Sequence, residues 1–95
     1  MKLLSFKPSD KADKKYMVVL ETDEGRKKTI HFGAAGMDDF TITKDMEQKQ
    51  RYINRHKARE DWNNPLTAGF WSKNILWNLP TITASLNDTK KRFNL

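Results

Sequence analysis

The first third of the chain has the pattern of β-structure, with short apolar runs separated by turn residues. Leu3–Phe6 and Tyr16–Glu21 are rich in residues that favour strands. Asp23–Gly25 is typical of a turn, and residues 26–32 then alternate between apolar and polar side chains. We therefore predict a hairpin of residues 16–22 with 26–32. The first strand should add to it, because an isolated hairpin is marginal in water.

The pattern from residue 44 onward is helical. A first helix, capped by Thr43, is expected from about Lys44 to Arg59 or Glu60. Leu66–Trp77 is apolar on more than one face, so we expect a second helix, begun by Pro65, at the centre of the core. Apolar spacing predicts a last helix, capped by Thr81 or Thr83, whose inner face holds Ile82, Leu86, Thr89 and Phe93.

This order, strands first and helices after, is typical of the α+β class. We expect a small antiparallel sheet, made of the N-terminal hairpin and one further strand, packed against about three C-terminal helices. Ninety-five residues suffice for a single domain, residues 1–95, with a β-rich part at 1–33 and a helical part at 44–95. The glycine-rich segment Gly33–Gly36 is expected to be a tight connection from strand to helix.

Composition narrows the class of protein. Lys and Arg number 18 and Asp and Glu 12, a net charge of +6, which favours polyanions or acidic protein surfaces as partners. Ten aromatic residues argue against a disordered chain. The absence of cysteine excludes disulfide-stapled secreted modules and thiolate metal sites. The sequence contains no apolar run long enough for a membrane span or a signal peptide, so we expect a protein that is not secreted.

Basic residues recur on one side of the first predicted helix. Arg51, Arg55 and Arg59 follow Gln48 at helical spacing, and an adjacent Tyr52 would stack on a base. The alternative is a solvated or protein-binding face in which Glu47 and Glu60 or Asp61 neutralise the arginines. The candidate residues for a polyanion or an acidic partner are Lys44, Lys49, Arg51, Tyr52, Arg55, Arg59, Lys90, Lys91 and Arg92.

Four aromatic residues lie close together around the second predicted helix: Trp62, Phe70, Trp71 and Trp77. Most of them are expected in the core of so small a domain. They exceed what one face can bury, so we expect Trp71 or Trp77 at the surface as an interface anchor.

Catalytic and metal-binding patterns are weak. The chain has two histidines, and a metal site drawn from His31, Asp38, Asp39 and Glu47 matches no known ligand spacing. Nothing in the sequence indicates a nucleophile–base pair or a phosphate-binding loop. We therefore predict no catalytic residue, no metal and no cofactor, and a protein that is not an enzyme.

Six stretches together resemble one family: 31–33, 39–41, 51–56, 67–72, 77–81 and 88–93. The most specific are Thr67–Ser72 and Trp77–Thr81. The resemblance is to small uncharacterised proteins of large eukaryotic DNA viruses, of the chlorella-virus and mimivirus kind, with relatives in some protists.

That resemblance implies a viral product located in the virion, or in the host cytoplasm or nucleus during assembly. The leading hypothesis is a non-enzymatic virion or capsid-associated structural protein that acts through contacts with virion proteins. The alternative is a non-sequence-specific nucleic-acid-binding module for DNA packaging. Both hypotheses use the arginine face of the first helix.

Overall fold

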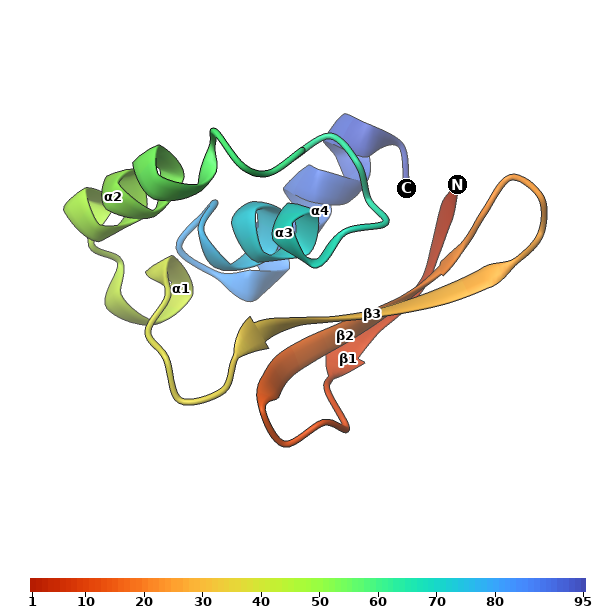
Figure 1. The fold of residues 1–95 in the computed structure, drawn as a ribbon, viewed down its shortest axis with the longest axis horizontal. Helices are drawn as coiled ribbons and strands as arrows, with labels where there is room; N and C mark the ends of the chain where they lie inside the picture. Colours follow the sequence, from red (N-terminus) through yellow and green to blue (C-terminus); the bar gives the residue numbers. More distant parts are fainter.

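The computed structural model describes residues 1–95, which form one antiparallel sheet and a layer of helices (Figure 1). The strands β1 (Lys2–Pro8), β2 (Lys14–Glu21) and β3 (Lys27–Ala34) lie in the order β1-β2-β3. The helices that follow are α1 (Phe40–Thr43), α2 (Met46–His56), α3 (Ala68–Trp71), the π-helix η1 (Ser72–Leu76) and α4 (Ile82–Phe93). The predicted α+β class is confirmed.

The predicted hairpin is β2 and β3. Glu21 faces Lys27 at its closed end, and Tyr16 faces Phe32 further along. Gly25 turns the chain with a φ of 81°, a conformation that costs glycine little. The expected first strand is β1, which pairs with β2 and bulges between Leu3 and Ser5.

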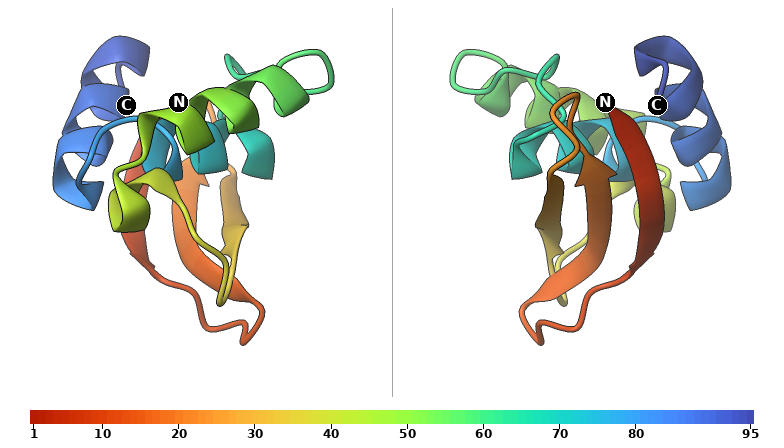
Figure 2. Two further views of the ribbon diagram at one scale, coloured as in Figure 1. Left: turned by 90° about the vertical axis from the view of Figure 1, so that its left-hand side faces the viewer. Right: turned by 90° about the vertical axis from the view of Figure 1, so that its right-hand side faces the viewer.

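The helices cover one face of the sheet, and the two views of Figure 2 show the other face open. The α3–η1 segment lies in the middle of this layer, as predicted for residues 66–77. The core contains Val18, Leu20, Phe32, Phe40, Tyr52, Phe70, Trp71, Ile75, Leu76 and Trp77. At Gly33 the two layers approach so closely that a Cβ atom there would lie 2.7 Å from Leu76 Cδ1.

The first predicted helix is shortened to α2, and a short helix that was not predicted, α1, precedes it. Asp39 caps α1 by accepting a hydrogen bond from the Thr41 N–H, and Asp45, not Thr43, caps α2. Lys44 between them adopts a left-handed conformation with φ 54°, which separates the two helices. Helix α2 ends at His56 rather than near Arg59, so Arg59 lies in the turn that follows.

The later helices keep their predicted places with changes at their ends. Thr67, rather than Pro65, marks the start of α3, because its hydroxyl accepts a hydrogen bond from the Phe70 N–H. Thr81, one of the two residues predicted as the cap, caps α4 by accepting a hydrogen bond from the Ala84 N–H. No helix combines the length and the apolar character that crossing a membrane requires.

Candidate functional site

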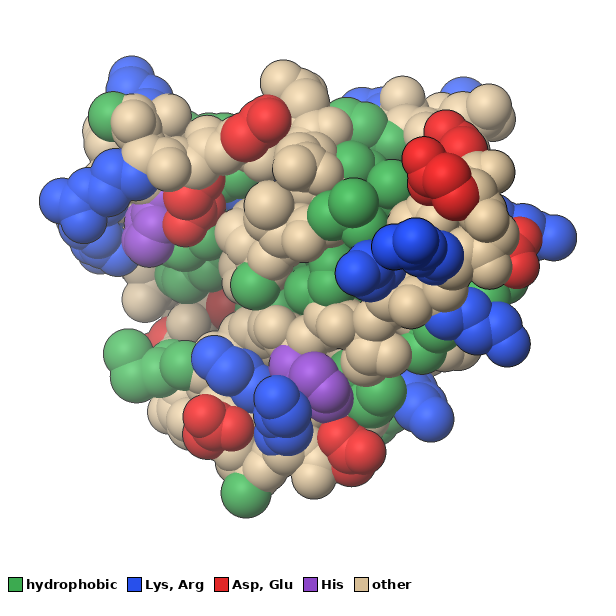
Figure 3. Space-filling model, turned by 45° about the vertical axis from the view of Figure 1, so that its right-hand side comes forward, with side chains coloured by type: hydrophobic (Ala, Val, Ile, Leu, Met, Phe, Trp, Pro, Cys, Tyr) green, Lys and Arg blue, Asp and Glu red, His purple; other side chains and the backbone are tan.

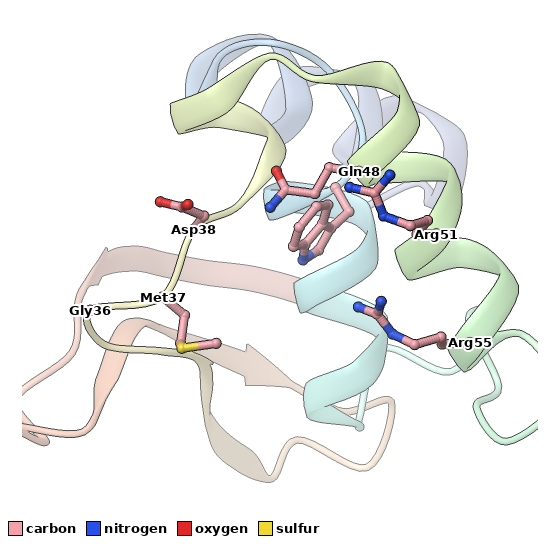
Figure 4. Close-up of a pocket in the computed structure, with 7 residues that line it drawn as sticks. Gly36, Met37, Asp38, Gln48, Arg51 and Arg55 are labelled. Atoms are coloured by element: carbon pink, nitrogen blue, oxygen red, sulfur yellow. The ribbon is translucent and has the colours of Figure 1, made fainter.

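Three polar side chains share one face of α2. The carboxylate of Asp45 accepts hydrogen bonds from the Glu47 and Gln48 N–H groups and thereby fixes the first turn. Gln48, Arg51 and Arg55 follow at spacings of three and four residues, which places them on one side of the helix. Figure 4 shows all three extending from α2 toward the loop after β3.

The space between α2 and this loop is a cleft of about 430 Å³. Its lining residues are Gly36, Met37, Asp38, Gln48, Arg51, Arg55 and Trp77. Two smaller clefts, of about 250 and 190 Å³, lie elsewhere on the surface. The largest cleft is therefore the one that the α2 arginines line.

The arginines of α2 have no acidic partner. Arg51 and Arg55 are exposed, and neither takes part in any of the ion pairs of the structure. The Glu60 carboxylate instead lies 3.0 Å from His56 Nδ1 and accepts a hydrogen bond from Trp62 Nε1 at 2.7 Å.

The other two acids are also directed elsewhere. Asp61 accepts from the Asn63 N–H, and Glu47 forms no ion pair. The prediction that Glu47 and Glu60 or Asp61 neutralise the arginines is wrong, because the chain turns after His56 and directs Glu60 toward Trp62. The two guanidinium groups are left available to an external anion.

Tyr52 lies inside the molecule and not beside the arginines. Its side chain is buried, and its ring stacks on Trp77 with centroids 4.5 Å apart and on His56 with centroids 4.3 Å apart. Burial, with Glu60 as a second cause, raises the pKa of the Tyr52 hydroxyl above its ordinary value. The prediction that Tyr52 stacks on a base is therefore wrong, and its role is to hold Trp77.

One of Trp71 and Trp77 was expected at the surface, but both are in the core. Trp71 is 0% exposed, and its Nε1 donates a hydrogen bond to the Pro65 carbonyl at 2.8 Å. Trp77 is 9% exposed and lines the α2 cleft. The half-buried tryptophan is Trp62. The sheet and the helices bury more aromatic surface than the single helical face assumed in the prediction.

The remaining basic candidates do not join the cleft. Lys49 donates to the Asn78 carbonyl at 2.6 Å, and Lys44 donates to the Thr41 carbonyl at 2.9 Å. Arg59 lies beside a different cleft, with Glu60 and Asp61. Lys44, Lys49 and Arg59 therefore add less positive charge beside Arg51 and Arg55 than their spacing in the sequence predicts.

The basic residues of α4 form a separate group. Figures 1 and 2 place the C-terminal end of this helix, with Lys90 and Lys91, near the N-terminus of the chain and away from α2. Arg92 is engaged there, because it donates to Asp88 and Asn74 at 2.8 Å each. Hydrogen bonds from Asn78 and then from Arg92 hold the pKa of Asp88 below its ordinary value. On the face seen in Figure 3, Lys and Arg side chains alternate with Asp and Glu and form no continuous basic surface.

One arrangement in the structure resembles catalytic geometry, and no sequence pattern predicted it. Ser9 Oγ lies 2.7 Å from His31 Nδ1, and His31 Nε2 lies 3.9 Å from Asp10 Oδ1. These contacts have the residue types of a nucleophile–base pair, which no pattern in the sequence indicated. No cleft is lined by these residues, and Ser9 Oγ also accepts from the Lys11 N–H, so the contacts fasten the β1–β2 loop to β3.

The metal set drawn from the sequence does not assemble. Asp39 accepts hydrogen bonds from Lys15 and Thr41, whereas His31 contacts Ser9. No group of three or more His, Asp or Glu side chains is placed to hold a metal ion. The α2 cleft is the one lined by two arginines, and neither of them forms an ion pair.

Comparison with known proteins gives one match. Residues 4–56 match a family of unknown function, DUF5754. The matched stretch runs from β1 to the end of α2 and contains every residue that lines the α2 cleft except Trp77. No curated protein and no solved structure matches the chain.

Proposed function

Because the chain belongs to DUF5754, a family of unknown function, its role has to be inferred from its own surface, and we propose that it binds nucleic acid without sequence specificity. The observation that carries this proposal is that Arg51 and Arg55 line one cleft and have no acidic partner. In a chain with 12 acidic residues, two neighbouring free guanidinium groups favour an external anion as the ligand.

The geometry suits phosphate contacts. Arg51 and Arg55 are four residues apart, so their side chains leave α2 about 6 Å apart along its axis. A guanidinium binds a phosphate with two parallel hydrogen bonds, and such contacts position a nucleic acid without reading its sequence. Arg59 is exposed in the turn after α2 and lines a different cleft, so it would contribute positive charge but not a contact inside the α2 cleft.

The viral resemblance of residues 31–93 gives the proposal a context. A large viral genome is a polyanion that has to be neutralised during packaging, and a small basic protein with free arginines would contribute to that. The proposed location is accordingly the virion, or the host cytoplasm or nucleus during assembly.

The test is fluorescence anisotropy with a labelled duplex at about 50 mM and about 200 mM salt. We expect binding to the wild type that weakens with salt, with a log–log slope of about −0.9 for each phosphate neutralised. The variant Arg51→Gln/Arg55→Gln should bind roughly tenfold more weakly or worse, and its slope should be shallower by about 1.8, the contribution of two phosphates.

The matched control is Lys27→Gln/Lys28→Gln, which removes the same charge from two exposed residues of β3. This control should retain the wild-type slope. If the two double variants weaken binding equally, the affinity depends on the net charge of the protein and not on the arginines of the cleft. Binding that does not depend on salt would contradict the proposal.

A second candidate function is a structural role in the virion through protein contacts. It is favoured by three exposed apolar side chains that lie within ten residues of the sequence: Met37 at 64%, Ile42 at 59% and Met46 at 64% exposure. Met37 also lines the cleft. Large exposed apolar side chains near one another are typical of protein interfaces. Negligible binding of nucleic acid even at low salt would favour this candidate over the first.

A further inference from the structure

The α2 cleft has the charge and the shape of a binding site for the end of a nucleic-acid strand. We propose that it binds a terminal phosphomonoester, the phosphorylated end of a nucleic acid or of a nucleotide. This inference rests on the proposed function and names the part of the nucleic acid that the cleft prefers.

The donors of the cleft match a phosphomonoester better than a phosphodiester. Arg51, Arg55 and the amide of Gln48 extend from α2 into one cleft. A terminal phosphate carries a charge of about −1.5 to −2 at pH 7 and presents three acceptor oxygens. An internal phosphodiester carries a single charge, so on a continuous strand the two guanidinium groups need two separate phosphates, whereas one terminal phosphate can balance both.

No protein carboxylate competes for these donors. Asp38 is the one acidic residue in the lining, and Figure 4 shows its carboxylate pointing away from both guanidinium groups. Asp39, its neighbour, is buried and bonded to Lys15 and Thr41. The anion that completes the charge of the cleft must therefore come from outside the chain.

The wall opposite α2 is held in place. Gly36 turns the loop with a φ of 81°, and the Met37 carbonyl and the Asp39 carboxylate both accept hydrogen bonds from the Lys15 ammonium group. This anchors the loop to β2 on either side of Asp38. A cleft of about 430 Å³ bounded by a fixed loop has the size of a small-molecule site, which a strand end fills more readily than a continuous strand.

The apolar part of the cleft lining can contact the sugar or the base of the terminal nucleotide. Trp77 is fixed by the Tyr52 ring, which lies parallel to it within 8°. Its exposed edge lines the cleft together with Met37. An indole edge and a thioether provide contacts for a sugar or a base that are tolerant of sequence.

The experiment compares two labelled single strands of the same sequence, one with a 5′-phosphate and one with a 5′-hydroxyl, by anisotropy at constant salt. A third strand carries a 3′-phosphate. We expect the wild type to bind one phosphorylated end roughly tenfold more tightly than the hydroxyl end. Arg51→Gln and Arg55→Gln should each abolish that ratio.

The matched control is Arg59→Gln, which removes an exposed arginine that does not line this cleft. It should weaken both strands alike and leave the ratio unchanged. Competition with inorganic phosphate and with a nucleoside 5′-monophosphate separates the sources of the group. Stronger competition by the nucleotide would show that the Trp77 wall contributes, and equal competition would place the preference in the phosphate alone.

The outcomes separate this inference from the proposed function. Equal binding of phosphorylated and hydroxyl strands, with affinity still dependent on Arg51 and Arg55, would overturn the inference and leave nucleic-acid binding standing. Absence of binding to every strand, with a ³¹P shift of the mononucleotide on titration of the protein, would overturn the proposed function and retain the terminal-phosphate site. Absence of both would overturn both.

Discussion

At the scale of single residues, helical spacing identified Arg51 and Arg55 but misplaced their neighbours. Periodicity shows which residues share a side of a helix, and these two do share one. It does not show where the helix ends or which side chains find partners across the fold. Arg59 therefore fell outside α2, and Lys49 was engaged by the Asn78 carbonyl, a residue far along the chain.

Tyr52 carries a prediction at this scale. Its buried hydroxyl has a raised pKa, so the folded state keeps the neutral phenol while an unfolded chain ionises near pH 10. The stabilisation is complete below that pH and is lost as the pH rises above it. Urea unfolding should show that Tyr52→Phe loses less stability than the wild type between about pH 9 and about pH 11. At neutral pH the variant should unfold with nearly the wild-type free energy, since the ring stack on Trp77 is retained; an unchanged alkaline profile would contradict this.

At the scale of elements, the order of strands and helices followed from local patterns. The hairpin of β2 and β3 and the cap of α4 at Thr81 are encoded by nearby residues, and both predictions are confirmed. The π-helical turn η1 could not be predicted, because its stabilising contacts come from α4. Asn74 in η1 is buried, its carbonyl accepts from the Thr89 hydroxyl at 3.1 Å, and its side-chain oxygen accepts from Arg92.

Thr89 therefore provides a test of how α4 holds η1. Thr89→Val keeps the shape of the side chain and removes the hydroxyl that donates to the Asn74 and Ser85 carbonyls. A buried carbonyl left without its donor should lower the free energy of unfolding by about 1–3 kcal/mol. Thr83→Val, at an exposed position of the same helix, should change it by less than about 0.5 kcal/mol. Equal effects in denaturant titrations would mean that the hydroxyl of Thr89 does not stabilise η1.

At the scale of the whole molecule, the sheet and the helical layer approach each other closely at Gly33. Its φ of 79° is a left-handed conformation, and Leu76 of η1 lies where a Cβ atom would project. The sequence predicted only that Gly33 belongs to a tight connection from strand to helix. Its contact with η1 could not be predicted, because the two segments are far apart in the sequence.

Two glycine substitutions can separate the destabilisation caused by contact with Leu76 from the destabilisation caused by backbone strain. Gly33→Ala adds both backbone strain and an overlap with Leu76, whereas Gly25→Ala at φ 81° meets no atom within 4 Å. The strain common to both should cost about 1–2 kcal/mol, and the overlap should add about 1–3 kcal/mol to Gly33→Ala alone. Thermal or chemical unfolding of the two variants measures the difference. Similar losses of stability would show that the layers can separate at little cost.

The position of α3 and η1 has a consequence for how the protein is made. The sheet emerges first during synthesis, with its apolar residues Val18, Leu20 and Phe32 on one face. The residues that cover that face, Phe70 to Leu76, are translated only after α2 is complete. Residues 4–56, the part that matches the family, thus contain the cleft arginines but not the helical residues that pack on the sheet. A nascent or truncated chain that ends at His56 would expose this apolar face to solvent, so we expect the sheet to fold stably only once residues 57–95 are present.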